Sequence, residues 1–355
     1  MRFLALLFCV ATSLPLHAGT LETYLRDTGM APADYVLQRL ERHPLVILGE
    51  GHWGRDDAEL VSSLVPKLHQ RGVALGIEWM SAKRQGDVDR LIAGTEWNRS
   101  LANDLMKSAD WPYLQYREIF HRAWESTHAH PELPAMQIVA LGPPPDWRKA
   151  GIDYDAFMAS RVAEYSGDQR RPMLVYCGMH HAFTRYLQVN RSRNGRVAQF
   201  MDRMGNILWR QFGEDVFLIA LEKPEMCGPR GEEETRYCLP LSGIIDCAAA
   251  SAGRPVGFDL AASPIAEMHL PASSFYAAGH PFVRIIDFAD GWIWQGPVDR
   301  LKLVEMIPFE ELSNDPSNDA GARKAWEKER EWLAHPMQRS AWRDLAKWRS
   351  NCGAQ

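Results

Sequence analysis

The chain has 355 residues, of which 46% are hydrophobic and 24% are charged, a composition typical of a globular protein and not of a disordered one. This length suits one large domain or two ordinary ones. The formal net charge is −5, so no overall basic character supports binding to nucleic acid. The basic segment at 191–196 is interpreted as a solvated loop.

The first 18 residues have the pattern of a secretory signal peptide. Arg2 precedes an apolar run at 3–10, and small residues at Ala18-Gly19 predict cleavage after Ala18. We therefore expect a periplasmic or secreted protein, with an uncut N-terminal anchor as the alternative. Beyond this leader no stretch is long and apolar enough to predict a transmembrane helix.

The first predicted elements form a strand–helix–strand unit. Residues 21–42 are expected to be helical, with a break near Pro32. LVILG (45–49) and VALGIEW (73–79) predict buried parallel strands, and an amphipathic helix at 55–71 connects them. Such a unit is typical of a right-handed crossover.

Strands and helices continue to alternate in the middle of the chain. A helical insertion rich in aromatic residues is expected at about 81–130, before a third strand at 136–142. A helix at 153–166 leads to a fourth strand at 172–178, and 181–212 is predicted to hold helices around a basic turn.

The remaining elements are less regular. A fifth strand is predicted at 215–221, and a cysteine-containing insertion at about 223–252 is expected to be irregular. Later strands are predicted at 256–260, 284–288 and 291–297, and a charged, Trp-rich helical tail at 320–349. The sequence thus predicts one α/β domain at 19–355, with its core at about 45–300 and a mostly parallel sheet flanked by helices.

Three cysteines lie close together in the predicted insertion: Cys227, Cys238 and Cys247. Because export leads to an oxidising compartment, we expect one disulfide within this trio, with Cys227–Cys238 preferred. The trio lacks the close cysteine pairs of a structural zinc site. The chain has no CxxCH motif for covalent haem attachment.

Polar residues follow three of the predicted strands. Glu50 and His52 follow the first strand, Glu78 ends the second, and His181 follows the fourth in a second G-x-x-H pattern. Ligands of open α/β sheets bind beyond the carboxyl ends of strands, so we expect these side chains to converge. His180 competes with His181 for the role of the inward-facing imidazole.

This constellation predicts hydrolytic chemistry. Two imidazoles and a carboxylate, here His52, His181 and Glu78, are a common ligand set for a catalytic divalent metal such as zinc or manganese. Glu50 would then act as the general base. Structural interpretations stay open: Glu78 paired with Lys83 or Arg84, His52 as a capping or core residue, and Glu50 as a charge at a helix N-terminus.

Other motifs are weak or absent. Asp56 and Asp57 are interpreted as charges that favour the N-terminus of the helix at 55–71. The chain contains no G-x-S-x-G elbow, no dinucleotide-binding glycine pattern and no Walker motif. The aromatic stretch at 111–124 is interpreted as core, with a role as roof of the crevice as the alternative.

VILGEGHWGRDDAELVSSLVPKL, VALGIEWM and MLVYCGMHHAF together resemble the superfamily that contains ChaN-like haem-binding uptake proteins, Tiki/TraB-type proteases and erythromycin esterases. The resemblance covers roughly 45–190. The Tiki-like branch implies a metal-dependent protease that uses His52, His181 and Glu78, whereas the esterase branch implies water activation by His52 with Glu50 and Glu78. The ChaN-like branch implies haem binding in iron uptake.

The chain departs from the ChaN-like pattern, because it lacks an evident lipobox and carries the cysteine insertion and the Trp-rich tail. Three hypotheses remain. The first is an exported hydrolase of ester or peptide bonds, acting on a small molecule or peptide. The second is a haem carrier with ligands among His180, His181, Tyr113 and Tyr116. The third is an envelope protein with a vestigial site.

Overall fold

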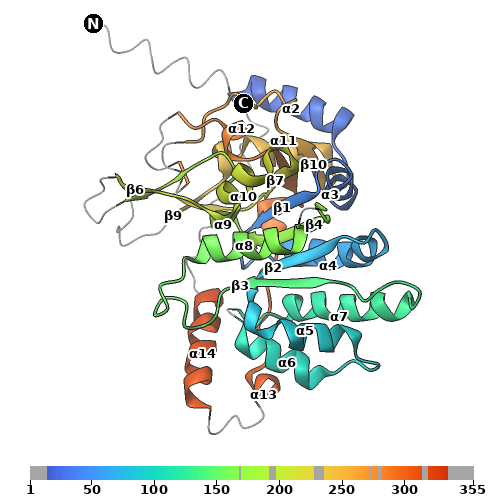
Figure 1. Cartoon of the computed structure of the whole chain (residues 1–355). Helices are drawn as coiled ribbons and strands as arrows, with labels where there is room; N and C mark the ends of the chain where they lie inside the picture. Colours follow the sequence, from blue (N-terminus) through green and yellow to red (C-terminus); the bar gives the residue numbers. More distant parts are fainter. Residues whose placement is uncertain are drawn as a thin grey trace, which may run out of the picture.

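The structure of the chain is a computed structural model (Figure 1). It describes residues 14–109, 111–167, 169–191, 197–227, 236–271, 274, 276–277, 282–313 and 319–334. Residues 1–13 of the predicted signal peptide lie outside this range. None of the described helices is long and apolar enough to span a membrane.

A seven-stranded sheet forms the centre of the described fold, in the order β10-β11-β7-β1-β4-β2-β3. All neighbouring strands are parallel except β10 and β11, which are antiparallel. The strands are β1 (Leu45–Glu50), β2 (Ala74–Ser81), β3 (Ile138–Gly142), β4 (Met173–Gly178), β7 (Val216–Leu221), β10 (Val256–Asp259) and β11 (Gly291–Trp294). The predicted α/β fold with a mostly parallel sheet is confirmed.

Helices cover both faces of the sheet. As a result, every residue of the central strands β1 and β4 is buried. In β1, Leu45 and Ile47 point to one core while Val46 and Leu48 point to the other. The first core includes residues of α2 (Leu14–Thr28), α8 (Tyr154–Ser166), α10 (Met204–Phe212) and α11 (Ile244–Ala252). The second includes residues of α3 (Pro32–Leu40), α4 (Arg55–Gln70), α5 (Gln85–Ala93), α6 (Arg99–Ser108) and α7 (Leu114–Ala129).

Single-turn helices connect several of these elements. They are η1 (Ala82–Arg84), η2 (Gly213–Asp215), η3 (Pro240–Gly243), η4 (Val298–Arg300), α9 (Met179–Ala182), α12 (Ile285–Phe288) and α13 (Phe309–Leu312). Of these, α9 matters most for the site, since it carries His180 and His181 directly after β4.

Two predicted elements are wrong. Residues 284–288, predicted as a strand, form the short helix α12, where the Arg284 guanidinium and the Asp287 carboxylate pair at 2.7 Å and stabilise the first turn. The segment 181–212 was predicted to hold helices around a basic turn, and only its two ends are helical, in α9 and α10. It instead contains an antiparallel hairpin of β5 (Gln188–Arg191) and β6 (Val197–Met201) before α10.

The cysteine-containing segment is more regular than predicted. It forms the hairpin strands β8 (Glu225–Cys227) and β9 (Arg236–Cys238), followed by α11. The register sets Cys227 opposite Arg236 and Cys238 opposite Glu225, so the two cysteines are not directly facing partners. The side chain of Cys227 lies outside the described part of the chain, and the Cys227–Cys238 disulfide stays a prediction.

The predicted tail helix begins as expected, as α14 (Ala320–Ala334), and the rest of 320–349 lies outside the described residues. The helix lies against the body of the protein through Trp326, whose indole N–H donates to the Ile307 carbonyl at 2.8 Å. The Trp326 ring also packs against Phe309. Trp326 therefore anchors α14.

Candidate functional site

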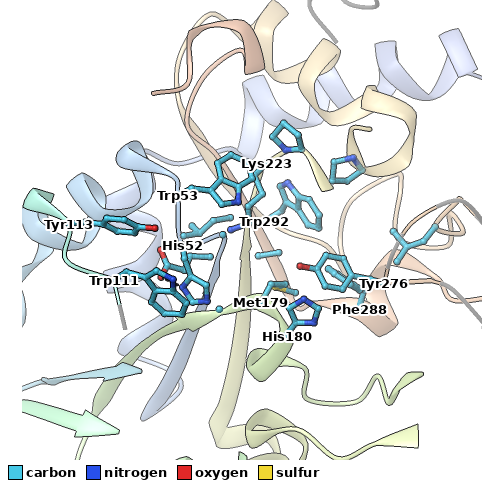
Figure 2. Close-up of a pocket in the computed structure, with 18 of the residues that line it drawn as sticks. His52, Trp53, Trp111, Tyr113, Met179, His180, Lys223, Tyr276, Phe288 and Trp292 are labelled. Carbon is cyan, nitrogen blue, oxygen red and sulfur yellow. Dashed lines mark hydrogen bonds and ion pairs between the residues drawn. The ribbon is translucent and has the colours of Figure 1, made fainter. Parts of the chain in front are cut away.

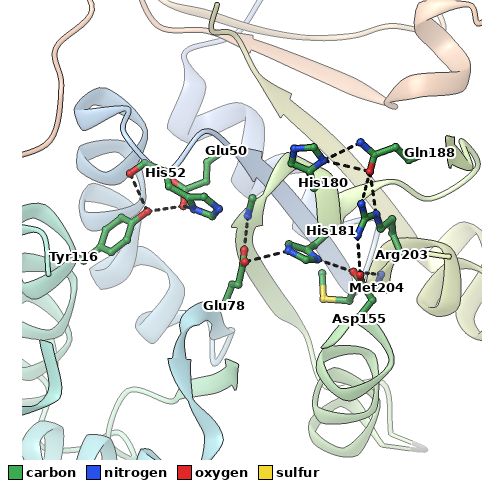
Figure 3. Close-up of polar contacts among 11 residues, drawn as sticks. Glu50, His52, Glu78, Tyr116, Asp155, His180, His181, Gln188, Arg203 and Met204 are labelled. Atoms are coloured by element: carbon green, nitrogen blue, oxygen red, sulfur yellow. Dashed lines mark hydrogen bonds and ion pairs between the residues drawn. The ribbon is translucent and has the colours of Figure 1, made fainter. Parts of the chain in front are cut away.

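The candidate site lies beyond the carboxyl ends of neighbouring strands (Figure 3). β1 ends at Glu50, and the turn into α4 carries His52. β4 ends at Gly178, after which the chain turns into α9 with His181. Since β1 pairs with β4 in parallel up to Glu50 and Gly178, both turns open on the same edge of the sheet.

Glu50 and His52 form a buried pair. His52 Nδ1 lies 3.0 Å from Glu50 Oε1, and the hydroxyls of Tyr116 and Tyr176 donate to the same carboxylate. Burial raises the pKa of Glu50, but the hydrogen bond from His52 and the tyrosine hydroxyls outweigh it, so the pKa is lowered. Glu50 is therefore an ionised acceptor whose oxygens already hold three donors.

His52 is held in place on its other sides as well. Its ring stacks on Trp111, with ring centres 3.8 Å apart. Burial lowers the pKa of His52, but the charges of Glu78 and Glu50 outweigh burial, so the pKa lies above its ordinary value. The Nδ1 atom is occupied by Glu50, which leaves Nε2 as the atom that faces the site.

Glu78 does not end its strand, as the sequence predicted, because β2 continues to Ser81. Its pairing with β4 stops at Ile77, however, and its register with β3 shifts after the same residue. Beyond Ile77 the strand no longer pairs with β4, and the Glu78 carboxylate accepts a hydrogen bond from the Gly178 backbone N–H at 2.6 Å. The carboxylate thus bridges from β2 to the end of β4.

His181 forms the second imidazole–carboxylate pair. Its Nδ1 lies 2.7 Å from Asp155 Oδ1, and its Nε2 lies 3.3 Å from Glu78 Oε1. Arg203 and the Met204 backbone N–H also donate to Asp155. Burial lowers the pKa of His181, but Glu78 and Asp155 outweigh it and raise the pKa above its ordinary value.

The surroundings of Gly178 show how closely His52 and Glu78 approach the backbone there. A Cβ atom placed there would lie 2.5 Å from His52 Nε2 and 3.4 Å from Glu78 Oε2, so only glycine leaves room for the imidazole. His52 Nε2 and the Glu78 carboxylate therefore meet over the same backbone atom. The structure thus places His52 and Glu78 on either side of Gly178, and Glu78 in turn pairs with His181.

The alternative structural partners of Glu78 are engaged elsewhere. Lys83 Nζ lies 3.4 Å from Asp146 Oδ1, and Arg84 pairs with Asp104 at 2.5 Å. The interpretation of Glu78 as a salt-bridge partner of these two cations is therefore wrong. Its partner within the site is His181.

Two cavities adjoin these side chains. The first has a volume of about 370 Å³ and is mostly apolar (Figure 2). Its wall includes Glu50, His52, Tyr113, His180 and Lys223. The second has a volume of about 1070 Å³, and its wall includes Glu78, Asp155 and His181. Trp111 lines both cavities.

The predicted haem ligands do not share one environment. His180 and Tyr113 line the apolar cavity, whereas His181 lines the other. Tyr116 is fully buried, and its hydroxyl is held by Glu50 at 2.6 Å, so it is not available as a ligand. Burial lowers the pKa of His180 to about 4, which keeps this imidazole neutral.

The predicted metal ligands are not arranged as a metal site. Among the described residues, no group of three or more His, Cys, Asp or Glu side chains could hold an ion. His181 Nε2 forms an ion pair with Glu78, whose second oxygen accepts the Gly178 N–H. The predicted set of His52, Glu78 and His181 is therefore not supported as a metal centre.

Sequence reasoning missed several groups at this site. Asp155 lies in the first turn of α8 and Arg203 directly before α10. Lys223 lies two residues beyond β7 and is paired with Asp57 at 3.4 Å, and burial raises the pKa of Asp57 to about 7. A search for charged residues just after every predicted strand would have found Lys223.

Comparison with known proteins first shows the fold. A solved succinoglycan biosynthesis protein aligns with 83% of this chain and 99% of its own, at 7% identity and a TM-score of 0.60. A protein from Bacillus cereus aligns with 82% and 99%, at 9% identity and a TM-score of 0.55. At such low identity these structures show a shared fold alone.

A mutant of the erythromycin esterase EreC aligns with 74% of this chain and 93% of its own, at 12% identity and a TM-score of 0.49. No curated protein matches the chain significantly. The profile of the family described as haem-binding uptake, Tiki superfamily, ChaN matches residues 36–150. This stretch contains Glu50, His52 and Glu78, and the match confirms there the resemblance found in the sequence.

Proposed function

We propose that the chain is a hydrolase of ester or amide bonds that activates water with its own side chains. The observation that carries this proposal is the meeting of two carboxylate-oriented imidazoles at Glu78. His52 is oriented by Glu50 at 3.0 Å, and His181 by Asp155 at 2.7 Å. A nucleophile or water with an oriented base beside it is the general signature of such catalysis.

The two imidazoles take different roles in this proposal. His52 Nε2 accepts a proton from the attacking water while its Nδ1–H stays bonded to Glu50, which fixes the tautomer and stabilises the cation that forms. His181 carries the proton that the leaving group needs. Glu78 lies between them and favours the charged form of each imidazole.

This assignment revises the role that the sequence suggested for Glu50. Its carboxylate is wholly buried and already accepts hydrogen bonds from His52, Tyr116 and Tyr176. Both of its oxygens already accept a hydrogen bond, and the side chain is not exposed to solvent. Glu50 therefore orients the base instead of acting as one.

The test uses His52→Asn and His181→Asn, assayed on a panel of chromogenic esters and amides. We expect each variant to lose about 10²- to 10⁴-fold in kcat/KM, the contribution of general acid–base catalysis, with unchanged circular dichroism. His43→Asn is the matched control, because His43 lies before the same strand β1, at its opposite end. Equal turnover in all four proteins would refute the proposal.

The same assay tests whether a metal ion takes part in catalysis. Since the proton transfers use only side chains, turnover is expected to survive dialysis against a chelator. Elemental analysis of protein purified without chelator completes this measurement. Activity lost on dialysis and restored by zinc or manganese would favour a metal mechanism instead.

Haem binding is the second candidate function, favoured by His180. This neutral imidazole lines an aromatic cavity together with Tyr113, and neutral imidazole is a common axial ligand of haem iron. The family match adds support, since its profile is named for haem-binding uptake. A haem titration should then give a Soret band that is lost in His180→Ala but kept in His128→Ala, an exposed histidine on α7. Absence of any Soret shift at micromolar haem would remove this candidate.

A further inference from the structure

His52 and Glu78 lie between two cavities that differ in polarity. The cavity beside His52 exposes mostly aromatic and aliphatic groups, whereas the cavity beside Glu78 and His181 combines charged and hydroxyl groups with apolar ones such as Trp147. Trp111 lines both, and its ring stacks on His52. A molecule that reaches from one cavity to the other past Trp111 therefore meets a mostly apolar wall on one side and a wall with many polar groups on the other.

The first cavity suits a compact apolar group. Its volume of about 370 Å³ lies at the small end of ligand pockets. Rings form much of its wall, from the residues Trp53, Trp111, Tyr276, Phe288 and Trp292 (Figure 2). Lys223 in its wall is mostly buried and is paired with Asp57 at 3.4 Å. An aromatic or branched acyl group would bury most of its surface here.

The second cavity suits a neutral polar group. Its wall carries the acids Glu78, Asp153 and Asp155 as well as the bases Arg148 and Arg203. Because both signs are present, a net charge on the ligand would meet repulsion as well as attraction. A group with several hydroxyls can instead donate to the acids and accept from the guanidinium groups.

The position of the proton donor decides which cavity holds the acyl side of the ester and which holds the alcohol side. The leaving alcohol oxygen requires a proton, and His181 lies in the wall of the polar cavity with Asp155 at 2.7 Å. His52, which would activate the water, lies in the wall of the apolar cavity. The acyl side of the bond thus belongs with His52 and the alcohol side with His181.

We propose, resting on the hydrolase function above, that the substrate is an amphipathic ester. Its compact apolar acyl group occupies the cavity of Trp53 and Trp292, and its neutral, hydroxyl-rich alcohol occupies the cavity of Arg148 and Arg203. The water oxygen bonds to the carbonyl carbon and gives one proton to His52. The bond from carbon to the alcohol oxygen breaks, and that oxygen takes a proton from His181. His52 returns its proton to solvent as the carboxylate leaves, and solvent reprotonates His181.

The test compares kcat/KM for three matched esters on the whole protein. 1-Benzoylglycerol has the proposed polarity, benzyl glycerate has the reverse polarity, and acetylglycerol lacks the apolar group. We expect 1-benzoylglycerol to be preferred over each of the others by at least about tenfold, the discrimination that one or two well-placed contacts provide. Equal or reversed preference would overturn the substrate class while leaving the hydrolase function intact.

Two variants assign each half to its cavity. Trp53→Ala should raise KM for 1-benzoylglycerol and not for acetylglycerol. Arg148→Gln should raise KM for 1-benzoylglycerol and not for methyl benzoate, which lacks the polyol. Lys149→Gln is the matched control, because Lys149 is the exposed neighbour of Arg148 and does not line the polar cavity. An identical response of both substrates to each variant would contradict the assignment.

Binding separates this inference from the hydrolase function. If no ester is turned over, tryptophan fluorescence can still report on the rings that line the apolar cavity. Tighter binding of 1-benzoylglycerol than of benzyl glycerate would keep the ligand class and discard hydrolysis. Binding of neither ester at millimolar concentration would overturn the inference.

Discussion

The two imidazole–carboxylate pairs of the site have the same plan but different surroundings. In each pair the carboxylate holds Nδ1 and leaves Nε2 toward Glu78. Glu50 is supported by the neutral hydroxyls of Tyr116 and Tyr176, whereas Asp155 is supported by the charged Arg203. Both carboxylates keep a lowered pKa. Asp155 accepts a hydrogen bond from a guanidinium, whereas the cation near Glu50, Lys223, is paired with Asp57.

The different surroundings of Glu50 and Asp155 indicate which imidazole depends more on its carboxylate partner. Without His52, the hydrogen-bond donors that remain at the wholly buried Glu50 are two hydroxyls, because the nearby Lys223 is paired with Asp57. Without Glu50, the positive form of His52 loses the anion at its Nδ1. Asp155 keeps Arg203 as a counter-ion even when His181 is neutral. The Glu50–His52 pair is therefore the more tightly coupled of the two.

The largest effect is expected for Glu50→Gln. The amide oxygen can still accept from His52, and its nitrogen can donate to a tyrosine hydroxyl, so the fold is expected to survive. The negative charge that stabilises protonated His52 is lost, however, and we expect kcat to fall by about 10³- to 10⁴-fold, as when an orienting carboxylate is neutralised in a catalytic triad. Steady-state kinetics with a thermal melt measures both quantities.

Tyr176→Phe serves as the control for this change, because it removes one donor to Glu50 and keeps the charge. A smaller loss of activity than in Glu50→Gln is expected. If the two variants were equally impaired, packing around the carboxylate and not its charge would explain the effect.

A smaller effect is expected for Asp155→Asn. The oxygen of asparagine can still accept from His181, and Glu78 remains as an anion at its Nε2. We expect kcat to fall by about 10²-fold, the lower range for loss of an acid catalyst. Arg161→Gln, at an ion pair on the exposed side of the same helix, is the control and should behave as the wild type. A greater loss in Asp155→Asn than in Glu50→Gln would reverse the ranking of the two pairs.

Much of the fold follows from local patterns in the sequence. The apolar runs before Glu50 and before Gly178 are short and buried on both sides, as parallel strands require. One failure arises where a local side-chain pair outweighs the apolar pattern. IIDF at 285–288 is apolar enough for a strand, yet the pairing of Arg284 with Asp287 favours a helical turn.

The site was predictable to the same extent. Glu50 ends β1, Glu78 lies near the end of β2, and His52 and His181 lie two and three residues beyond β1 and β4. Parallel pairing therefore brings these four residues to one edge of the sheet. Asp155 was not predictable, because the position of α8 over β3 and α10, and not a strand end, brings it to His181. Which histidine of His180 and His181 faces Glu78 depends on the turn of α9, which the sequence pattern does not specify.

The smallest expected change is in the pH dependence of kcat/KM. This measurement also distinguishes the roles of the two imidazole–carboxylate pairs most directly. The pKa values of His52 and His181 are both raised by neighbouring carboxylates. A base must be neutral and an acid protonated, so kcat/KM should fall at low pH as His52 gains its proton and at high pH as His181 loses its own.

Glu50→Gln removes an anion from His52 and should move the acid limb to lower pH, which widens the profile. Asp155→Asn should move the alkaline limb to lower pH, which narrows it. Because the imidazoles interact through Glu78, each limb belongs to the coupled pair, but opposite changes in width are expected only if the two pairs serve opposite proton transfers. Profiles that shift in parallel would assign both imidazoles the same role.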